Sequence, residues 1–91
     1  MQTLPPNVGA THRTPVFTQD TIPSGLLGEH KTKAGMWGKI VVLSGAIIYR
    51  ILYEHPEEHR LTPEKSGVVE PEVPHQVQSV GPVEFYVEFY R

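Results

Sequence analysis

Two histidines in this chain of 91 residues stand where they could bind a ligand or a metal ion. His30 and His75 each fall within, or at the start of, a stretch that predicts a strand. His75 follows the prolines of EPEVPH (70–75) and shares a strand face with Val77, so we expect its ring to point into the core. A small β-structure could then bring the two rings together.

Imidazole is the commonest protein ligand for Zn, Fe, Ni and Cu, and carboxylates complete such sites. Glu29, Glu70 and Glu72 lie close to the two histidines in the sequence. The pattern therefore predicts a divalent-metal site of His30 and His75, completed by Glu29, Glu72 or water, with Zn, Ni, Fe or Mn as the ion. The alternative is that both histidines line a metal-free pocket or form hydrogen bonds in the core.

The other three histidines are weaker candidates for a function. His12 lies in a stretch rich in proline. His55 and His59 have the i, i+4 spacing of a helical metal site, but Pro56 and neighbouring glutamates favour a solvated hairpin tip over 54–60.

The elements that must position these residues are predicted to be strands. In VEFYVEFYR (83–91), Val and Phe alternate with Glu and Tyr, which is typical of a strand with one buried face. KIVVLSGAIIYRILY (39–53) predicts two strands around a tight turn at Ser44 and Gly45. TPVFT (14–18) and LLGEHKTK (26–33) predict further short strands, after an N-terminal arm over 1–12. Roughly seven or eight short strands indicate an all-β barrel or sandwich over 13–91.

The composition excludes several classes of function. A formal net charge of −2 argues against nucleic-acid binding, which needs a basic face. The chain has no cysteine and no Gly-x-Ser-x-Gly motif, so thiol and serine nucleophiles have no support. Polar residues interrupt the longest apolar run, 40–52, and residues 1–15 lack an apolar core. We therefore expect a cytoplasmic protein with no signal peptide and no membrane contact.

Three stretches carry a resemblance to a known family: HKTKAGMWGK (30–39), EPEVPH (70–75) and VEFYVEFYR (83–91). Together they are similar to the small bacterial cupins related to the N-terminal domain of the tellurite-resistance protein TehB and to YeaR. The resemblance covers residues 13–91, nearly the whole chain. It implies a single-domain cupin, which is a double-stranded β-helix or jelly-roll barrel.

Cupins commonly bind one divalent metal through two histidines and a glutamate from a first motif and one histidine from a second. By this resemblance His75 is the second-motif histidine, His30 is one first-motif histidine, and Gly45 is that motif's last glycine. The other first-motif histidine is replaced by Thr32, and the glutamate falls near Gly38. Two of the four ligands are therefore missing, which favours binding over catalysis.

The function that the resemblance implies is binding of a divalent metal or a small ligand, related to tellurite resistance or oxidative stress. Lys31 and Lys33 would either attract an oxyanion ligand at the barrel mouth or, as we favour, belong to a solvated strand edge. Trp37 would fill the barrel or, as the less favoured alternative, stack on a ligand. One alternative is a metal-dependent cupin enzyme of the oxygenase or isomerase type. The other is a metal-free sensor or structural module, with a homodimer formed through the outward Glu and Tyr side chains of 83–91. Methyl transfer is not expected, because the chain has no βαβ pattern for the cofactor.

Overall fold

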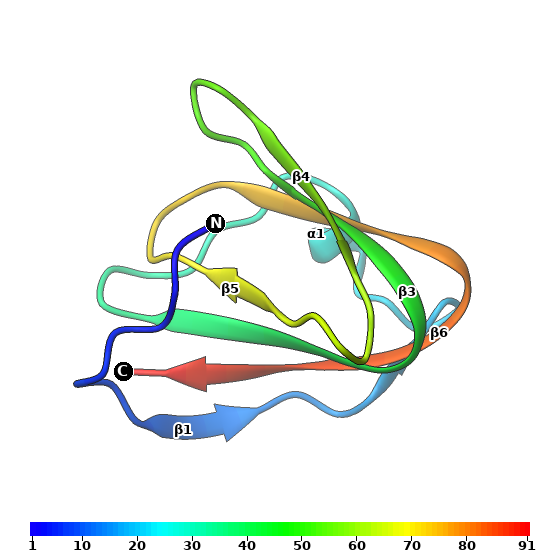
Figure 1. Cartoon of the computed structure of the whole chain (residues 1–91), viewed down its shortest axis with the longest axis horizontal. Coiled ribbons are helices and arrows are strands. Elements are labelled where there is room, and N and C mark those ends of the chain that lie inside the picture. The colour runs from blue at the N-terminus through cyan, green and yellow to red at the C-terminus, as the bar shows by residue number, and fades with distance from the viewer.

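The computed structural model describes all 91 residues and consists almost entirely of antiparallel strands, as the all-β prediction requires. Figure 1 shows the elements in chain order, which are listed here with their bounds: β1 (Ala10–Arg13), β2 (Phe17–Thr18), α1 (Ser24–Leu27), β3 (Trp37–Ile51), β4 (Glu57–Leu61), β5 (Gly67–Val69) and β6 (His75–Tyr90).

The long strands β3 and β6 form the framework of the sheet. They pair from Trp37 opposite Tyr90 to Ile51 opposite His75, with irregular register near the middle. β4 and β5 pair with β3, whereas β1 and β2 pair with β6. Both long strands bend, so the sheet folds over itself (Figure 1). We call the half formed by 37–42 and 85–90 the first limb, and the half formed by 46–51 and 75–80 the second limb.

The expected pair of strands around a tight turn within 39–53 is wrong: the structure has one continuous strand that bends there. Ser44 and Gly45 do not end a strand, because β3 runs through them with two register shifts against β6. Gly45 has a φ of 78°, and a Cβ there would lie 2.2 Å from the carbonyl oxygen of Pro82. Glycine is required at this position because any side chain would push the two strands apart.

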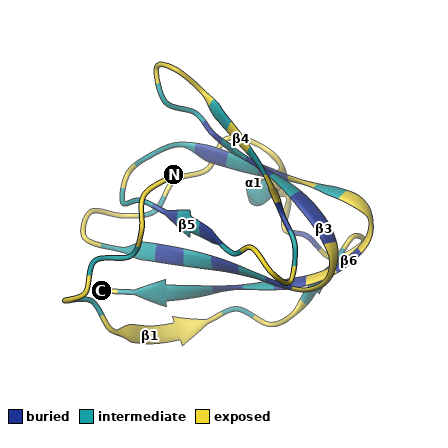
Figure 2. Cartoon of the chain, viewed as in Figure 1, coloured by how far each residue is buried: buried dark blue, intermediate teal, exposed yellow.

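The core lies between the two limbs. The predicted alternation of the closing segment is confirmed, because Val83, Phe85 and Val87 are buried whereas Glu84 is exposed. The same alternation appears along β3 as dark blue and teal bands in Figure 2. Apolar side chains of both limbs therefore share one hydrophobic cluster.

Two further expectations about the elements were wrong. Residues 26–33 are not a strand: Leu26 belongs to the short helix α1, and His30 and Thr32 form only isolated bridges. Residues 10–12 of the expected N-terminal arm belong to a strand, since β1 pairs with the end of β6. No helix in the structure has both the length and the apolar character needed to cross a membrane.

Candidate functional site

One pocket opens between the limbs, with a volume of about 240 Å³. Most of its wall is apolar and comes from strands of both limbs and from the segment before them. The main apolar side chains of the wall are Phe17, Ile40, Val69, Val77, Phe85 and Val87. Thr14, Leu26, Thr32 and Phe89 extend this wall, together with both predicted histidines, His30 and His75.

The fold brings His30 and His75 together, as the sequence predicted. Their backbones form a two-way bridge, in which each amide N–H donates to the other's carbonyl, at 2.9 and 2.7 Å. The ring centroids lie 5.4 Å apart, and the ring planes are nearly perpendicular at 85°. His75 is almost fully buried at the start of β6, whereas His30 is exposed and lies at the pocket's edge.

The segment before His75 fixes the direction in which this residue enters the sheet. Glu72 has a φ of 63°, and its amide N–H donates to the carbonyl of Thr32 at 3.0 Å. The carbonyl of Pro74 accepts from the amide of Leu52 at 2.8 Å. The prolines remove backbone freedom, and these two bonds tie the turn to its neighbours. The turn that leads into His75 is therefore fixed by hydrogen bonds to two different segments of the chain.

The ring of His75 has one nitrogen committed to the protein and one available to the pocket. Nδ1 lies 3.1 Å from the carbonyl oxygen of Val73, and a carbonyl can only accept, so Nδ1 carries the proton of this bond. Nε2 has no hydrogen-bond partner, and because no fully buried side-chain nitrogen or oxygen lacks one, this nitrogen is not fully buried. Since His75 lines the pocket, we infer that Nε2 opens onto it. Burial lowers the pKa of His75, and His30 lowers it further, whereas the bond to Val73 opposes them. The neutral ring therefore presents an acceptor at Nε2.

The remaining polar side chains of the wall have their protons committed elsewhere. The hydroxyl of Thr32 donates to the carbonyl of Met36 at 2.7 Å. The hydroxyl of Thr14 donates to the carbonyl of Pro15 at 2.9 Å and accepts from the amide of Val87 at 3.0 Å. The hydroxyl protons of both threonines are therefore unavailable to a ligand, whereas the two histidine rings are available.

The pocket supplies fewer ligands than a typical protein metal site. No group of three or more histidine, cysteine, aspartate or glutamate side chains converges anywhere in the structure. Glu29 and Glu72 are exposed and do not line the pocket. Catalytic zinc sites use three protein ligands, and here two histidines are available. Thr32 and Gly38, the two positions where the resemblance lacks a ligand, both line the pocket. The pocket wall therefore has no metal-binding side chain at the two positions where other cupins have one.

The two residues predicted to contact a ligand lie outside this wall. Trp37 is half-buried at the start of β3, and Lys33 is exposed in the turn before it. Neither lines the pocket. Sequence reasoning missed Phe17 and Thr14 as wall residues, and no local pattern marks them.

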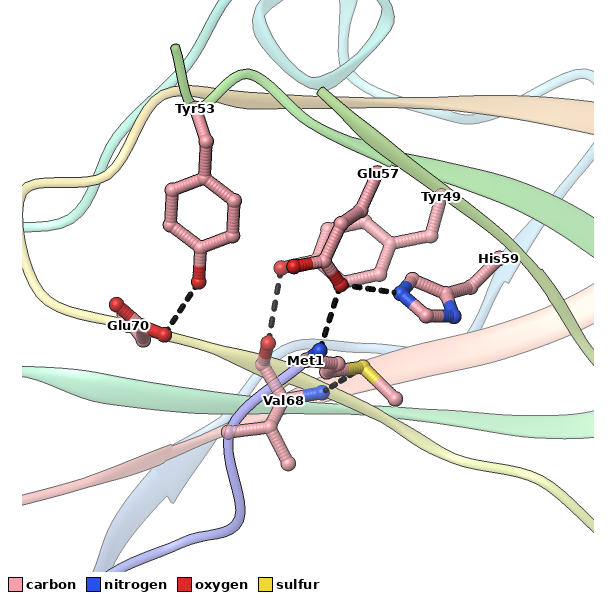
Figure 3. A network of polar contacts seen from close by, with 7 residues as sticks. All are labelled: Met1, Tyr49, Tyr53, Glu57, His59, Val68 and Glu70. Carbon is pink, nitrogen blue, oxygen red and sulfur yellow. Dashed lines mark hydrogen bonds and ion pairs between the residues drawn. The ribbon is translucent and has the colours of Figure 1, made fainter. Parts of the chain in front are cut away.

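A second polar cluster lies around β4 and does not belong to the pocket (Figure 3). His59 contacts the carboxylate of Glu57 at 2.8 Å, and the same carboxylate binds the ammonium of Met1 at 2.6 Å. On the neighbouring strand, the hydroxyl of Tyr49 donates to the carbonyl of Val68 at 2.9 Å. The ring of Tyr49 also packs edge-on against His75 at 5.9 Å, so this bond supports the wall of the pocket.

Comparison with known proteins gives one family. The model of the TehB-like domain matches residues 12–87. A curated relative from Haemophilus influenzae, the probable S-adenosyl-L-methionine-dependent methyltransferase TehB, is 40% identical over 70 residues, or 72% of this chain and 24% of that protein. The chain thus spans about a quarter of the curated relatives it matches.

Solved structures show the same fold. The crystal structure of TehB from Haemophilus influenzae matches with a TM-score of 0.82 and 34% identity, over 91% of this chain and 31% of that one. A protein from Escherichia coli K12 matches with a TM-score of 0.88 and 25% identity, over 100% and 97%. Co(II) HppE in complex with Tris buffer matches with a TM-score of 0.58 and 25% identity, over 68% and 36%. These neighbours confirm the predicted cupin-type fold.

Proposed function

The chain belongs to the TehB-like domain family, and from its site geometry we propose that it is a small-ligand-binding module whose ligand occupies the pocket at His30 and His75. One observation supports this proposal above the others: an apolar pocket of about 240 Å³ is lined by His75, whose Nδ1 is hydrogen-bonded and whose Nε2 has no partner in the protein. Concave apolar sites with a few convergent polar groups are typical of small-molecule sites.

Pocket binding can be tested with a pair of neighbouring leucines in α1. Leu26 lines the pocket, whereas Leu27 is 49% exposed and does not. A fragment library is screened by ligand-observed NMR against the native chain, Leu26→Trp and Leu27→Trp. We expect fragments that bind the native chain and Leu27→Trp but not Leu26→Trp, because the indole fills the pocket. Binding that Leu26→Trp leaves unchanged would place the ligands elsewhere and contradict the proposal.

From the family resemblance we also propose that this binding is related to tellurite resistance or oxidative stress. This relation is tested by survival of bacteria on tellurite when they produce the native chain, Leu26→Trp or Leu27→Trp. If the pocket serves this resistance, Leu26→Trp alone should lose the protection. Equal survival with all three forms would separate the pocket from tellurite.

The second candidate is a metal-dependent cupin enzyme. It is favoured by the paired histidines, one with a free Nε2, and by the Co(II) form of a protein with the same fold. Elemental analysis of untagged protein, before and after incubation with Zn, Ni, Mn or Fe(II), tests this candidate. Stoichiometric metal that is lost in both His30→Ala and His75→Ala would favour it over metal-free binding.

A further inference from the structure

We propose that the ligand of this pocket is a neutral, largely apolar molecule of the phenol or alcohol class, whose hydroxyl donates a hydrogen bond to Nε2 of His75. This inference rests on the proposed function and adds the chemical class of the ligand. It follows from three properties of the pocket: its lack of Lys, Arg, Asp and Glu side chains, the acceptor at Nε2 of its buried histidine, and its size.

The absence of fixed charge argues against an ionic ligand. No lysine, arginine, aspartate or glutamate lines the pocket. A carboxylate or oxyanion entering it would lose its water against Phe85 and Val87 without gaining a cation, which is strongly unfavourable. Lys33, the cation expected to attract an oxyanion, is exposed and outside the wall.

The direction of the hydrogen bond follows from the tautomer of His75. The proton of its ring is on Nδ1, bound to the carbonyl of Val73, so Nε2 can only accept. The hydroxyl protons of Thr14 and Thr32 point to backbone carbonyls. A ligand that displaces water from Nε2 without offering a donor leaves this nitrogen unpaired in an apolar site, which weakens binding by roughly tenfold.

The size of the pocket suits a substituted benzene ring. A dry cavity of about 150 Å³ in another protein binds benzene. The pocket here, at about 240 Å³, has room for the ring and one or two further groups. The aromatic side chains of Phe17 and Phe89 in its wall can pack against such a ring.

Three probes of nearly the same shape separate the chemical classes: 4-ethylphenol, which has a donor; 4-ethylanisole, in which a methyl replaces that proton; and 4-ethylbenzoate, which is an anion. Their dissociation constants are measured by NMR titration against the native chain and Leu26→Trp. We expect 4-ethylphenol to bind about tenfold more tightly than 4-ethylanisole, and 4-ethylbenzoate to bind most weakly. Leu26→Trp should weaken binding of both neutral probes.

The hydrogen bond to His75 is detected by NMR without substituting that residue, because a substitution at this buried position can unfold the chain. In ¹⁵N-labelled protein, the Nε2 resonance of His75 should have the shift of an unprotonated nitrogen. It should move on addition of 4-ethylphenol and stay nearly still with 4-ethylanisole, while both probes perturb methyl signals of Val77. The ring nitrogens of His30, which the backbone bridge keeps close to His75, are followed in the same spectra as the internal comparison for Nε2 of His75.

The outcomes distinguish this inference from the proposed function. Equal affinity of the two neutral probes, or an Nε2 resonance that does not shift on addition of 4-ethylphenol, would overturn the assignment of the ligand as a hydrogen-bond donor. The pocket would still be a ligand-binding site. Tightest binding of 4-ethylbenzoate would overturn the assignment of a neutral ligand. If none of the three probes binds, while Leu26→Trp still abolishes binding of other fragments, the proposed chemical class of the ligand is wrong but the proposed function stands. The proposed function fails only if no fragment depends on Leu26.

Discussion

The bend at Gly45 should be the position in the sheet least tolerant of a single added methyl group. Its φ of 78° already disfavours any other residue, which costs about 1–2 kcal/mol for alanine. The added Cβ of Gly45→Ala would also lie 2.2 Å from the carbonyl oxygen of Pro82, where ordinary contacts begin near 3.4 Å. The strands would have to separate by about 1 Å, and such overpacking costs a further 1–3 kcal/mol.

Gly81 supplies a matched control on the opposite strand of the same bend. Its φ is 67°, but a Cβ there meets nothing within 4 Å. Gly81→Ala should therefore carry the backbone strain alone, about 1–2 kcal/mol, whereas Gly45→Ala should lose about 2–5 kcal/mol. For a 91-residue chain, whose total stability is on the order of 5–14 kcal/mol, the second loss is a large share.

Urea unfolding of the native chain and the two variants, followed by far-UV circular dichroism, measures this difference. With a slope of about 1–1.5 kcal/mol per molar urea, the midpoint should fall by about 0.7–2 M in Gly81→Ala and by a larger amount, about 1.3–5 M, in Gly45→Ala. A Gly45→Ala chain that does not fold, beside a folded Gly81→Ala chain, agrees with the reasoning. Equal midpoints for the two variants would refute it, because the close approach to Pro82 would then carry no cost.

The strands that the sequence predicted well are those whose burial is decided by local alternation. Along 83–89, Val83, Phe85 and Val87 form one buried face because successive side chains point to opposite sides of a strand. The inward position of His75 was predictable for the same reason, since it stands two residues before the buried Val77. Period-two patterns need no knowledge of the partner strand.

The bend at Gly45 could not be predicted in this way. A Ser-Gly pair inside an apolar run fits either a hairpin turn or a bulge in a continuous strand. The choice depends on the partner, and β6 bends at Gly81 in step with β3. Similarly, His30 and Thr32 alternate as a strand would, but each pairs with a single residue: His75 at the start of β6, and Pro71 in the segment before it. Pairing between distant segments decides both cases.

The same limit applies to the site. The sequence identified His30 and His75. The other residues that line the pocket around them come from four different strands and from the segment before β3. Nothing local indicates that Phe17 faces Phe85, with ring centroids 5.6 Å apart. The carboxylates chosen from their position in the sequence, Glu29 and Glu72, are exposed because nearness in sequence does not set side-chain direction.

The remaining predictions concern the histidine and the walls around it. Since the pKa of His75 is lowered in the native state, the unfolded chain takes up a proton first, so the free energy of unfolding should fall as pH drops below about 6.5; a native His75 found protonated by NMR at pH 6 would contradict this. Tyr49→Phe removes the bond to Val68 and should cost about 1 kcal/mol in urea unfolding, more than Tyr90→Phe, whose hydroxyl is bound at the surface. Gly38→Glu should add a third metal ligand to the two histidines of the pocket. The Cβ of a residue at position 38 would lie 3.2 Å from Val69 and 3.6 Å from Val87, on the inward face, so its carboxylate would join His30 and His75 as a third donor. Titration with Zn²⁺ should give one site in Gly38→Glu and none in Gly38→Gln; equal binding by the native chain would show that two histidines already suffice, and the case for a metal-free pocket would fail.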